Sequence, residues 1–201
     1  MVRIERLTIG ADPDAWRRAG FAVGEGGTNV GGVRIDFRPG EGLLGWRLDG
    51  ADSLEVDGLP AQPAASGDVD QDEHPNGATH IDHVVVLTPE LGRTTAALAG
   101  IGVERRRVRE VETDDGLLRQ GFFRFGEVIL EVVEHARIDP GPAHFWGITF
   151  AVADLDSCAT LLGVSLGSVR DAVQPGRRIA TVRGSAGLGL PVALISAPGD
   201  A

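Results

Sequence analysis

Residues 80–91 read His80-Ile81-Asp82-His83-Val84-Val85-Val86-Leu87-Thr88-Pro89-Glu90-Leu91. The first eight residues are rich in β-branched side chains, which favour a strand. Thr88-Pro89 then places a capping side chain before a proline, and a proline loses nothing at the first position of a helix. The stretch therefore predicts a strand over 80–87 that leads directly into a helix.

The same order of signals occurs twice more in the chain. Strand-like runs at 2–9 and 145–152 lead into helix starts at Asp12-Pro13 and Asp154. The short amphipathic helices are predicted to end at glycines that accept the left-handed conformation: Gly20, Gly100 and Gly163. Three strand-like pieces follow each helix, so the repeated unit is βαβββ.

The repeats divide the chain into modules. The predicted later strands are 21–23, 33–37 and 43–48 in the first module, 103–112, 117–125 and 128–133 in the second, and 168–173, 178–183 and 191–196 in the third. The modules are placed at 1–58, 79–136 and 144–197, with a linker at 59–78. The linker is rich in Pro, Ala, Gly and Asp. A calcium loop is the alternative for Asp68-Val69-Asp70-Gln71-Asp72, but that motif's central glycine and distal glutamate are missing.

Composition limits the classes of function. The 201 residues carry a net charge of −10, which disfavours binding to nucleic acid or to an anionic membrane. No apolar run reaches the length of a membrane span, and the N-terminus lacks the apolar core of a signal peptide. Cys158 is the one cysteine, so no internal disulfide forms. We therefore expect a cytoplasmic protein without nucleic-acid or membrane partners.

Three segments carry a resemblance to a known family. Residues 81–91 resemble the opening strand and helix of a vicinal oxygen chelate module, the superfamily of glyoxalase I, bleomycin-resistance proteins and extradiol dioxygenases. Residues 128–133 resemble the closing strand of such a module, and residues 147–156 resemble the opening of a second one. The resemblance implies an α+β fold in which βαβββ modules form a half-open mixed β-barrel with helices outside, the second module pairing with the third.

The resemblance also implies a site inside the barrel. His83 matches the metal ligand on the first strand, and Glu131 matches the ligand on the fourth strand and is the candidate proton acceptor. Strand alternation agrees, because it places His83 on a face with Ile81 and Val85 and Glu131 on a face with Ile129 and Val133. A polar side chain on an apolar face usually has a partner. The alternatives are a half-buried structural histidine and a carboxylate at the open side of the barrel.

The third module departs from the family pattern. Its first-strand position falls on Gly147 or Thr149, and its fourth-strand position falls near Ala193. Zinc takes three or four protein ligands, and this chain supplies two clear ones. The cofactor is therefore a divalent metal (zinc, nickel, manganese or iron) or none. A metal site would be completed across a homodimer, or by loop residues such as His80, Glu134 or His135.

Three modules cannot form two pairs within one chain. One module either pairs across a dimer or packs at the side as an accessory sheet, and we favour the homodimer.

Three further residues are predicted to contact the substrate: Arg119, Phe123 and Arg178. Arg119 belongs to a group of arginines that could bind an anion through bidentate contacts, together with Arg105, Arg106, Arg107, Arg109 and Arg124. The favoured alternative for that group is an exposed strand balanced by glutamates.

The leading hypothesis is a glyoxalase-like protein acting on a small oxygen-bearing metabolite, as a metal-dependent lyase, isomerase or dioxygenase with an incomplete metal site. The alternative is a non-catalytic dimer that binds a small molecule, similar to bleomycin-resistance proteins.

Overall fold

The computed structural model describes residues 1–64 and 72–197, and its strands form two sheets. In chain order the elements are β1 (Arg3–Gly10), α1 (Pro13–Arg18), β2 (Thr28–Val30), β3 (Val33–Arg38), β4 (Gly42–Asp49), β5 (Ala61–Pro63), β6 (Ala78–Thr88), α2 (Leu91–Gly100), β7 (Arg105–Thr113), β8 (Gly116–Phe125), β9 (Val128–Glu134), β10 (His144–Val152), α3 (Leu155–Leu162), the 3-10 helix η1 (Gly163–Ser165), β11 (Arg170–Asp171), β12 (Arg178–Thr181), the 3-10 helix η2 (Gly184–Ala186) and β13 (Val192–Ser196). One sheet has five strands in the order β2-β3-β1-β4-β5, and the other has eight in the order β11-β12-β13-β10-β6-β9-β8-β7.

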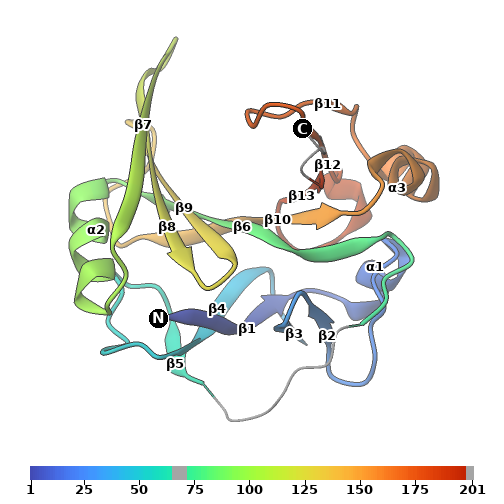
Figure 1. The fold of residues 1–201 in the computed structure, drawn as a ribbon, viewed down its shortest axis with the longest axis horizontal. Helices are drawn as coiled ribbons and strands as arrows, with labels where there is room; N and C mark the ends of the chain where they lie inside the picture. Colours follow the sequence, from blue (N-terminus) through green and yellow to red (C-terminus); the bar gives the residue numbers. More distant parts are fainter. Residues whose placement is uncertain (65–71, 198–201) are drawn as a thin grey trace.

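The eight-stranded sheet is built on the antiparallel pair β6 and β10 at its centre. Each of these strands also pairs in parallel with a later strand, β6 with β9 and β10 with β13. The sheet curls, so its edge strands β7 and β11 rise on opposite sides of an open concave face (Figure 1). The predicted α+β class with a half-open barrel is confirmed.

The five-stranded sheet packs against the opposite, convex face of the larger sheet (Figure 1). Trp46 of β4 lies 5.2 Å from the ring of Phe125, and Phe21 lies 5.0 Å from the ring of Phe150. These aromatic contacts join both sheets in one apolar core, in which each pair adds about 0.5–1.5 kcal/mol beyond its area burial. Of the two arrangements expected for the extra module, the structure contains the accessory sheet; the homodimer stays a prediction.

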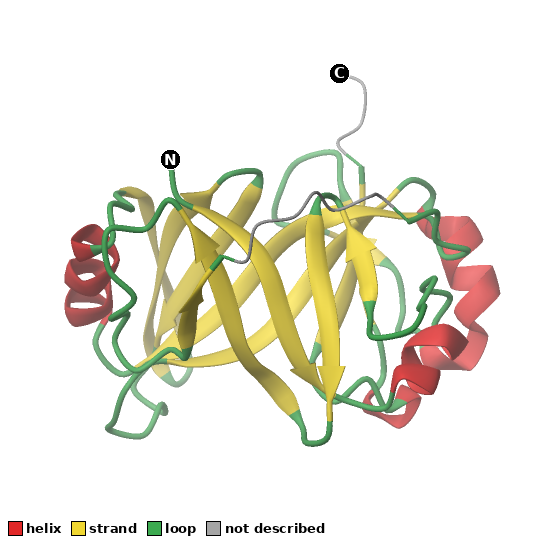
Figure 2. Ribbon diagram, turned by 90° about the horizontal axis from the view of Figure 1, so that it is seen from below, coloured by secondary structure: helices red, strands yellow, loops and turns green. Residues whose placement is uncertain are grey.

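The helices lie at the two ends of the sheets, α2 at one end and α1 and α3 at the other (Figure 2). Asp12 and Asp154 cap α1 and α3 through their side chains, as predicted. The start of α2 differs in part: Thr88 accepts from the N–H of Glu90 at 3.1 Å, but the helix begins at Leu91 and not at Pro89. The N–H of Leu91 donates to Glu134 of β9 at 2.5 Å. The C-terminal glycine also differs, because Gly102, with φ of 85°, takes the left-handed conformation expected of Gly100. In residues 1–64 and 72–197, no helix has the length and hydrophobicity of a transmembrane span.

The first module and the linker depart most from the prediction. The strand expected at 21–23 is absent, and β2 at Thr28–Val30 takes its place beside β3. Within the predicted linker, β5 pairs with β4, and His74 is buried with its Nδ1 accepting from the N–H of Ala22 at 3.1 Å. The proposed calcium loop lies largely outside the described residues; Asp72, its last member, accepts from the N–H of Asn29 at 2.8 Å.

Candidate functional site

A β-bulge in β6 positions two polar side chains of the site. His83 pairs with Thr149 of β10, but the next pair joins Ile81 to Phe150, so Asp82 is an extra residue in β6. A bulge of this kind turns two consecutive side chains toward the same side of the strand. Asp82 and His83 therefore lie together, whereas Ile81 packs in the core and not beside His83 as strict alternation predicted.

Asp82 is held from two sides. Its Oδ2 accepts from Nδ1 of His83 at 2.8 Å, and its Oδ1 accepts from Nη1 of Arg177 at 2.6 Å. Burial alone would raise the pKa of Asp82, but the hydrogen bonds and charges of His83 and Arg177 outweigh it and lower the pKa below its usual value. Asp82 is therefore ionised at neutral pH, and the proton of the shared hydrogen bond belongs to Nδ1 of His83.

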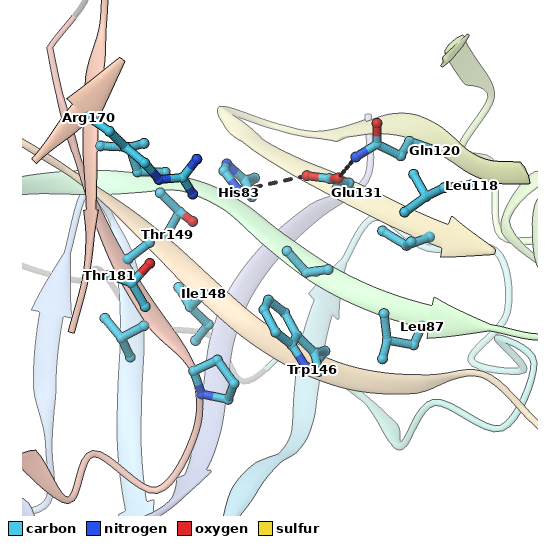
Figure 3. Close-up of a pocket in the computed structure, with 16 residues that line it drawn as sticks. His83, Leu87, Leu118, Gln120, Glu131, Trp146, Ile148, Thr149, Arg170 and Thr181 are labelled. Carbon is cyan, nitrogen blue, oxygen red and sulfur yellow. Dashed lines mark hydrogen bonds and ion pairs between the residues drawn. The ribbon is translucent and has the colours of Figure 1, made fainter. Parts of the chain in front are cut away.

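This arrangement turns the other nitrogen of His83 toward Glu131. Nε2 lies 3.8 Å from Oε2 of Glu131, and Oε1 of Glu131 accepts from the side-chain amide of Gln120 at 2.5 Å (Figure 3). The side chains of His83 and Glu131 are 14% and 15% exposed, so each keeps a small part open to the concave face. The pair is thus oriented by Asp82 on one side and by Gln120 on the other, while Nε2 and Oε2 face the same space.

That space is a groove with two halves that share five lining residues: His83, Gln120, Glu131, Arg170 and Ile179. The first half has a volume of about 360 Å³ and is mainly apolar; the side chains that give it this character are Val85, Leu87, Leu118, Val133, Trp146 and Val192. Thr149 and Thr181 add hydroxyl groups on its other wall (Figure 3). An apolar wall with few convergent polar groups is typical of a small-molecule site.

The second half of the groove is larger, about 550 Å³, and is lined from both edges of the curled sheet. Arg107 and Arg109 of β7 stand on one side of it, and Arg170 of β11 stands on the other. Arg170 extends toward His83 and Thr149 (Figure 3).

The third module places no metal ligand opposite His83 and Glu131. Thr149 and Ala193 line the groove at the two positions that correspond to them, and they pair with each other across β10 and β13. At Gly147 a Cβ atom would lie 2.7 Å from the carbonyl oxygen of Pro191, so no larger residue fits there. Within residues 1–64 and 72–197, no group of three His, Cys, Asp or Glu side chains is arranged to hold a metal ion.

The loop residues considered as completing ligands have other contacts. Glu134 binds the N–H of Leu91 and the guanidinium of Arg119. Nδ1 of His135 accepts from the N–H of Arg137 in the turn after β9. Nδ1 of His80 contacts the hydroxyl of Thr79. The donor set in the described chain therefore consists of His83 and Glu131, which does not fit a site of three or four protein ligands.

The three predicted substrate contacts lie outside the groove. Phe123 is buried in the core, because the alternation of β8 turns Leu118, Gln120 and Phe122 toward the groove instead. Arg119 pairs with Glu110 and Glu134 on the other side of the strand. Arg178 pairs with Asp156 of α3 at 2.7 Å, and its neighbour Ile179 lines the groove.

Asp82, Gln120 and Arg177 belong to the site but were missed in the sequence. An aspartate within a run of β-branched residues was the available signal at position 82, because a carboxylate is costly to bury without a partner. Nothing in the sequence near Arg177 indicates a partner 95 residues away.

Similarity to known proteins is found in the fold and not in the sequence. No family model and no curated protein sequence matches it. A mutant of 4-hydroxymandelate synthase from Streptomyces coelicolor matches with a TM-score of 0.65 at 14% identity, over 99% of this chain and 93% of that one. Methylmalonyl-CoA epimerase from Mycobacterium tuberculosis matches with a TM-score of 0.48 at 17% identity, over 62% of this chain and 91% of that one. At this level of identity the likeness to 4-hydroxymandelate synthase concerns the fold alone.

Proposed function

We propose that this chain, which has the vicinal oxygen chelate fold, binds a small oxygen-bearing metabolite in its groove and moves a proton on it with His83 and Glu131. The observation that carries the proposal is the convergence of Nε2 and Oε2 on the groove, each from a side chain that a second group orients. Paired and oriented acid–base groups in a largely apolar pocket are typical of proton-transfer sites.

Glu131 and His83 would have different roles in proton transfer. A carboxylate such as Glu131 can take a proton from carbon next to a carbonyl group, and Gln120 keeps its second oxygen occupied. His83 carries its proton on Nδ1, so Nε2 accepts a proton from the ligand's hydroxyl or, when protonated, returns one to its oxygen. A proton leaves one atom of the ligand and another is delivered to a second atom, which is the chemistry of an isomerase or, with loss of water, of a lyase.

The ionised Asp82 supports this role of His83. It fixes the tautomer and stabilises the imidazolium that forms when Nε2 accepts a proton. Arg177 keeps Asp82 ionised and in place, so the two act through His83 and do not reach the ligand.

A non-catalytic binding protein is the second candidate. It is supported by Thr149 and Ala193, which stand where a metal-binding module would carry ligands. In that case the groove would sequester a ligand, and His83 and Glu131 would serve only as hydrogen-bonding groups.

The test is deuterium incorporation from D₂O into α-hydroxyketones and 2-oxoacids, followed by proton NMR. We expect exchange above the buffer rate with the wild-type protein, insensitive to EDTA, and its loss in Glu131→Gln and His83→Gln. Glu127→Gln is the matched control, because Glu127 is exposed at the β8–β9 turn and pairs with Arg124.

Elemental analysis of the untagged protein accompanies the exchange assay. Stoichiometric metal that disappears in His83→Ala and Glu131→Ala would contradict proton transfer by these two side chains without a metal. A metal-to-chain ratio of about one half would indicate a site shared in a dimer. Saturable binding of the same compounds without any exchange would overturn proton transfer and leave the binding protein.

A further inference from the structure

Three arginines line the second half of the groove. In the described residues, Arg107, Arg109 and Arg170 have no carboxylate partner, whereas Arg119 and Arg178 are engaged in ion pairs. Glu131 is the one carboxylate among the described residues that line this half. The groove therefore concentrates positive charge in a protein whose net charge is −10.

The strands explain why these arginines face the groove. Arg107 and Arg109 are two residues apart in β7, so they share a face, and Glu110 points to the other face, where it binds Arg119. Arg107 pairs across the sheet with Phe122 and lies over its ring, 4.8 Å from the centroid. That contact holds the guanidinium above the groove without neutralising its charge.

The strand pairing also gives the distance between Arg107 and Glu131 across the groove. Arg107 pairs with Phe122, and Phe122 pairs with Glu131, so Arg107 and Glu131 are two strands apart. Neighbouring strands lie about 4.8 Å apart, which separates the two backbones by about 10 Å. A ligand of a few bonds can therefore touch an arginine and the acid–base pair together.

We propose that the groove binds an amphipathic anion: a carboxylate or phosphate end against Arg107, Arg109 and Arg170, and an apolar end in the half lined by Leu87, Leu118 and Trp146. The atoms between the two ends then lie against His83 and Glu131. This inference deepens the proposed function by naming the substrate class, and it rests on that proposal only for the role of the atoms in the middle.

Arginine is well suited to such an anionic end. Its planar guanidinium binds carboxylate and phosphate oxygens in pairs, and three of them from opposite edges of the sheet can surround one group. A neutral apolar ligand would leave all three charges without a partner.

The test compares two fluorescent probes that differ by one charged group. They are 8-anilinonaphthalene-1-sulfonate and its neutral parent N-phenyl-1-naphthylamine. We expect the sulfonate to bind the wild-type protein more tightly than the parent. In Arg107→Gln/Arg109→Gln, sulfonate affinity should fall about tenfold while the affinity for the neutral probe stays within about twofold. Arg170 lines both halves, so Arg170→Gln should weaken sulfonate binding more than binding of the neutral probe.

Two controls define the site. Arg105→Gln removes the same charge from the same strand, but Arg105 does not line the groove, so both affinities should stay unchanged. Val133→Trp fills the apolar half, so both probes should be lost. Sulfonate binding should also weaken between 0.05 and 0.5 M salt, roughly as expected for screened charges.

Competition with phenyl phosphate, phenylacetate and benzyl alcohol separates the two anions. Displacement by the first two and not by benzyl alcohol supports the proposal, and their ranking identifies the preferred head group. Equal affinity of the two probes in the wild type, or an unchanged affinity ratio in the arginine variants, would overturn it. Glu131→Gln distinguishes the two proposals: it should abolish deuterium exchange but retain or strengthen sulfonate binding, because it removes a negative charge from the groove.

Discussion

Removal of the Asp82 carboxylate should destabilise the whole protein, because it isolates a buried charge. The side chains of Asp82 and Arg177 are 8% and 10% exposed, and among the described residues Nη2 of Arg177 already has no hydrogen-bond partner. In Asp82→Ala, Nη1 loses its acceptor as well, and only the bond from Nε to the carbonyl of Ser196 remains.

The expected loss follows from this geometry. Breaking a buried ion pair by removing one partner costs about 3–5 kcal/mol. For a chain of this size each kcal/mol lowers the melting temperature by roughly 2–4 °C, so the variant should melt about 6–20 °C below the wild type. Asp82→Ala/Arg177→Met removes both charges and should recover most of the loss, to within about 1–2 kcal/mol of the wild type.

Urea unfolding monitored by tryptophan fluorescence measures both variants, since Trp16 and Trp46 are buried. Asp49→Ala is the control: Asp49 pairs with Arg3 on the surface, where side-chain exposures are 42% and 68%, and it should cost less than about 1 kcal/mol. A loss below about 1 kcal/mol in Asp82→Ala, or a double variant no more stable than Asp82→Ala, would refute the buried-charge argument.

Three further predictions concern separate parts of the chain. Thr149→His/Ala193→Glu supplies the two missing ligands and should create a site for zinc or nickel with His83 and Glu131; calorimetry should show one metal per chain, and at 100 times the dissociation constant the metal should add about 2.7 kcal/mol of stability. Burial lowers the pKa of His74, against smaller opposing effects of a hydrogen bond to Asn29 and the charge of Asp72. As the pH falls, His74 therefore becomes protonated at a higher pH in the unfolded chain than in the folded one. Stability should therefore fall as the pH drops below about 6.5, by at most about 1.4 kcal/mol per pH unit, and His74→Gln should remove this part of the slope in urea titrations. Burial, followed by the charge of Asp154, raises the pKa of Cys158 to about 11, so a disulfide reagent at pH 8 should label it only in urea; rapid labelling of the native protein would contradict its burial.

The repeated pattern of strand, helix start and glycine was enough to predict most of the strands of the second module. The predicted strands at 80–87, 117–125 and 128–133 agree with β6, β8 and β9 to within two residues, because their side chains are β-branched or aromatic and the turns are marked by Gly116 and Gly126. The prediction for the first module was less accurate, because β2 has only three residues and lies between the glycine pairs Gly26-Gly27 and Gly31-Gly32.

The candidate site was predicted only in its centre. His83 and Glu131 face the same groove because their strands β6 and β9 are neighbours in the module. The bulge at Asp82, the pairing with Arg177 and the cap from Glu134 depend on contacts between distant segments, which local sequence does not encode.

The position of the five-stranded sheet has a consequence during synthesis on the ribosome. Residues 1–63 contain every strand of that sheet, so it can form early, while Trp46 of β4 and Trp16 of α1 are not yet covered by the larger sheet. The cover depends on Phe125, Phe145 and Phe150, and β10 must emerge before β6 gains its antiparallel neighbour. At about 5–20 residues per second, the nascent chain therefore exposes an aromatic surface and an unpaired strand edge for several seconds. During that interval the partly synthesised chain exposes apolar side chains that the complete fold buries.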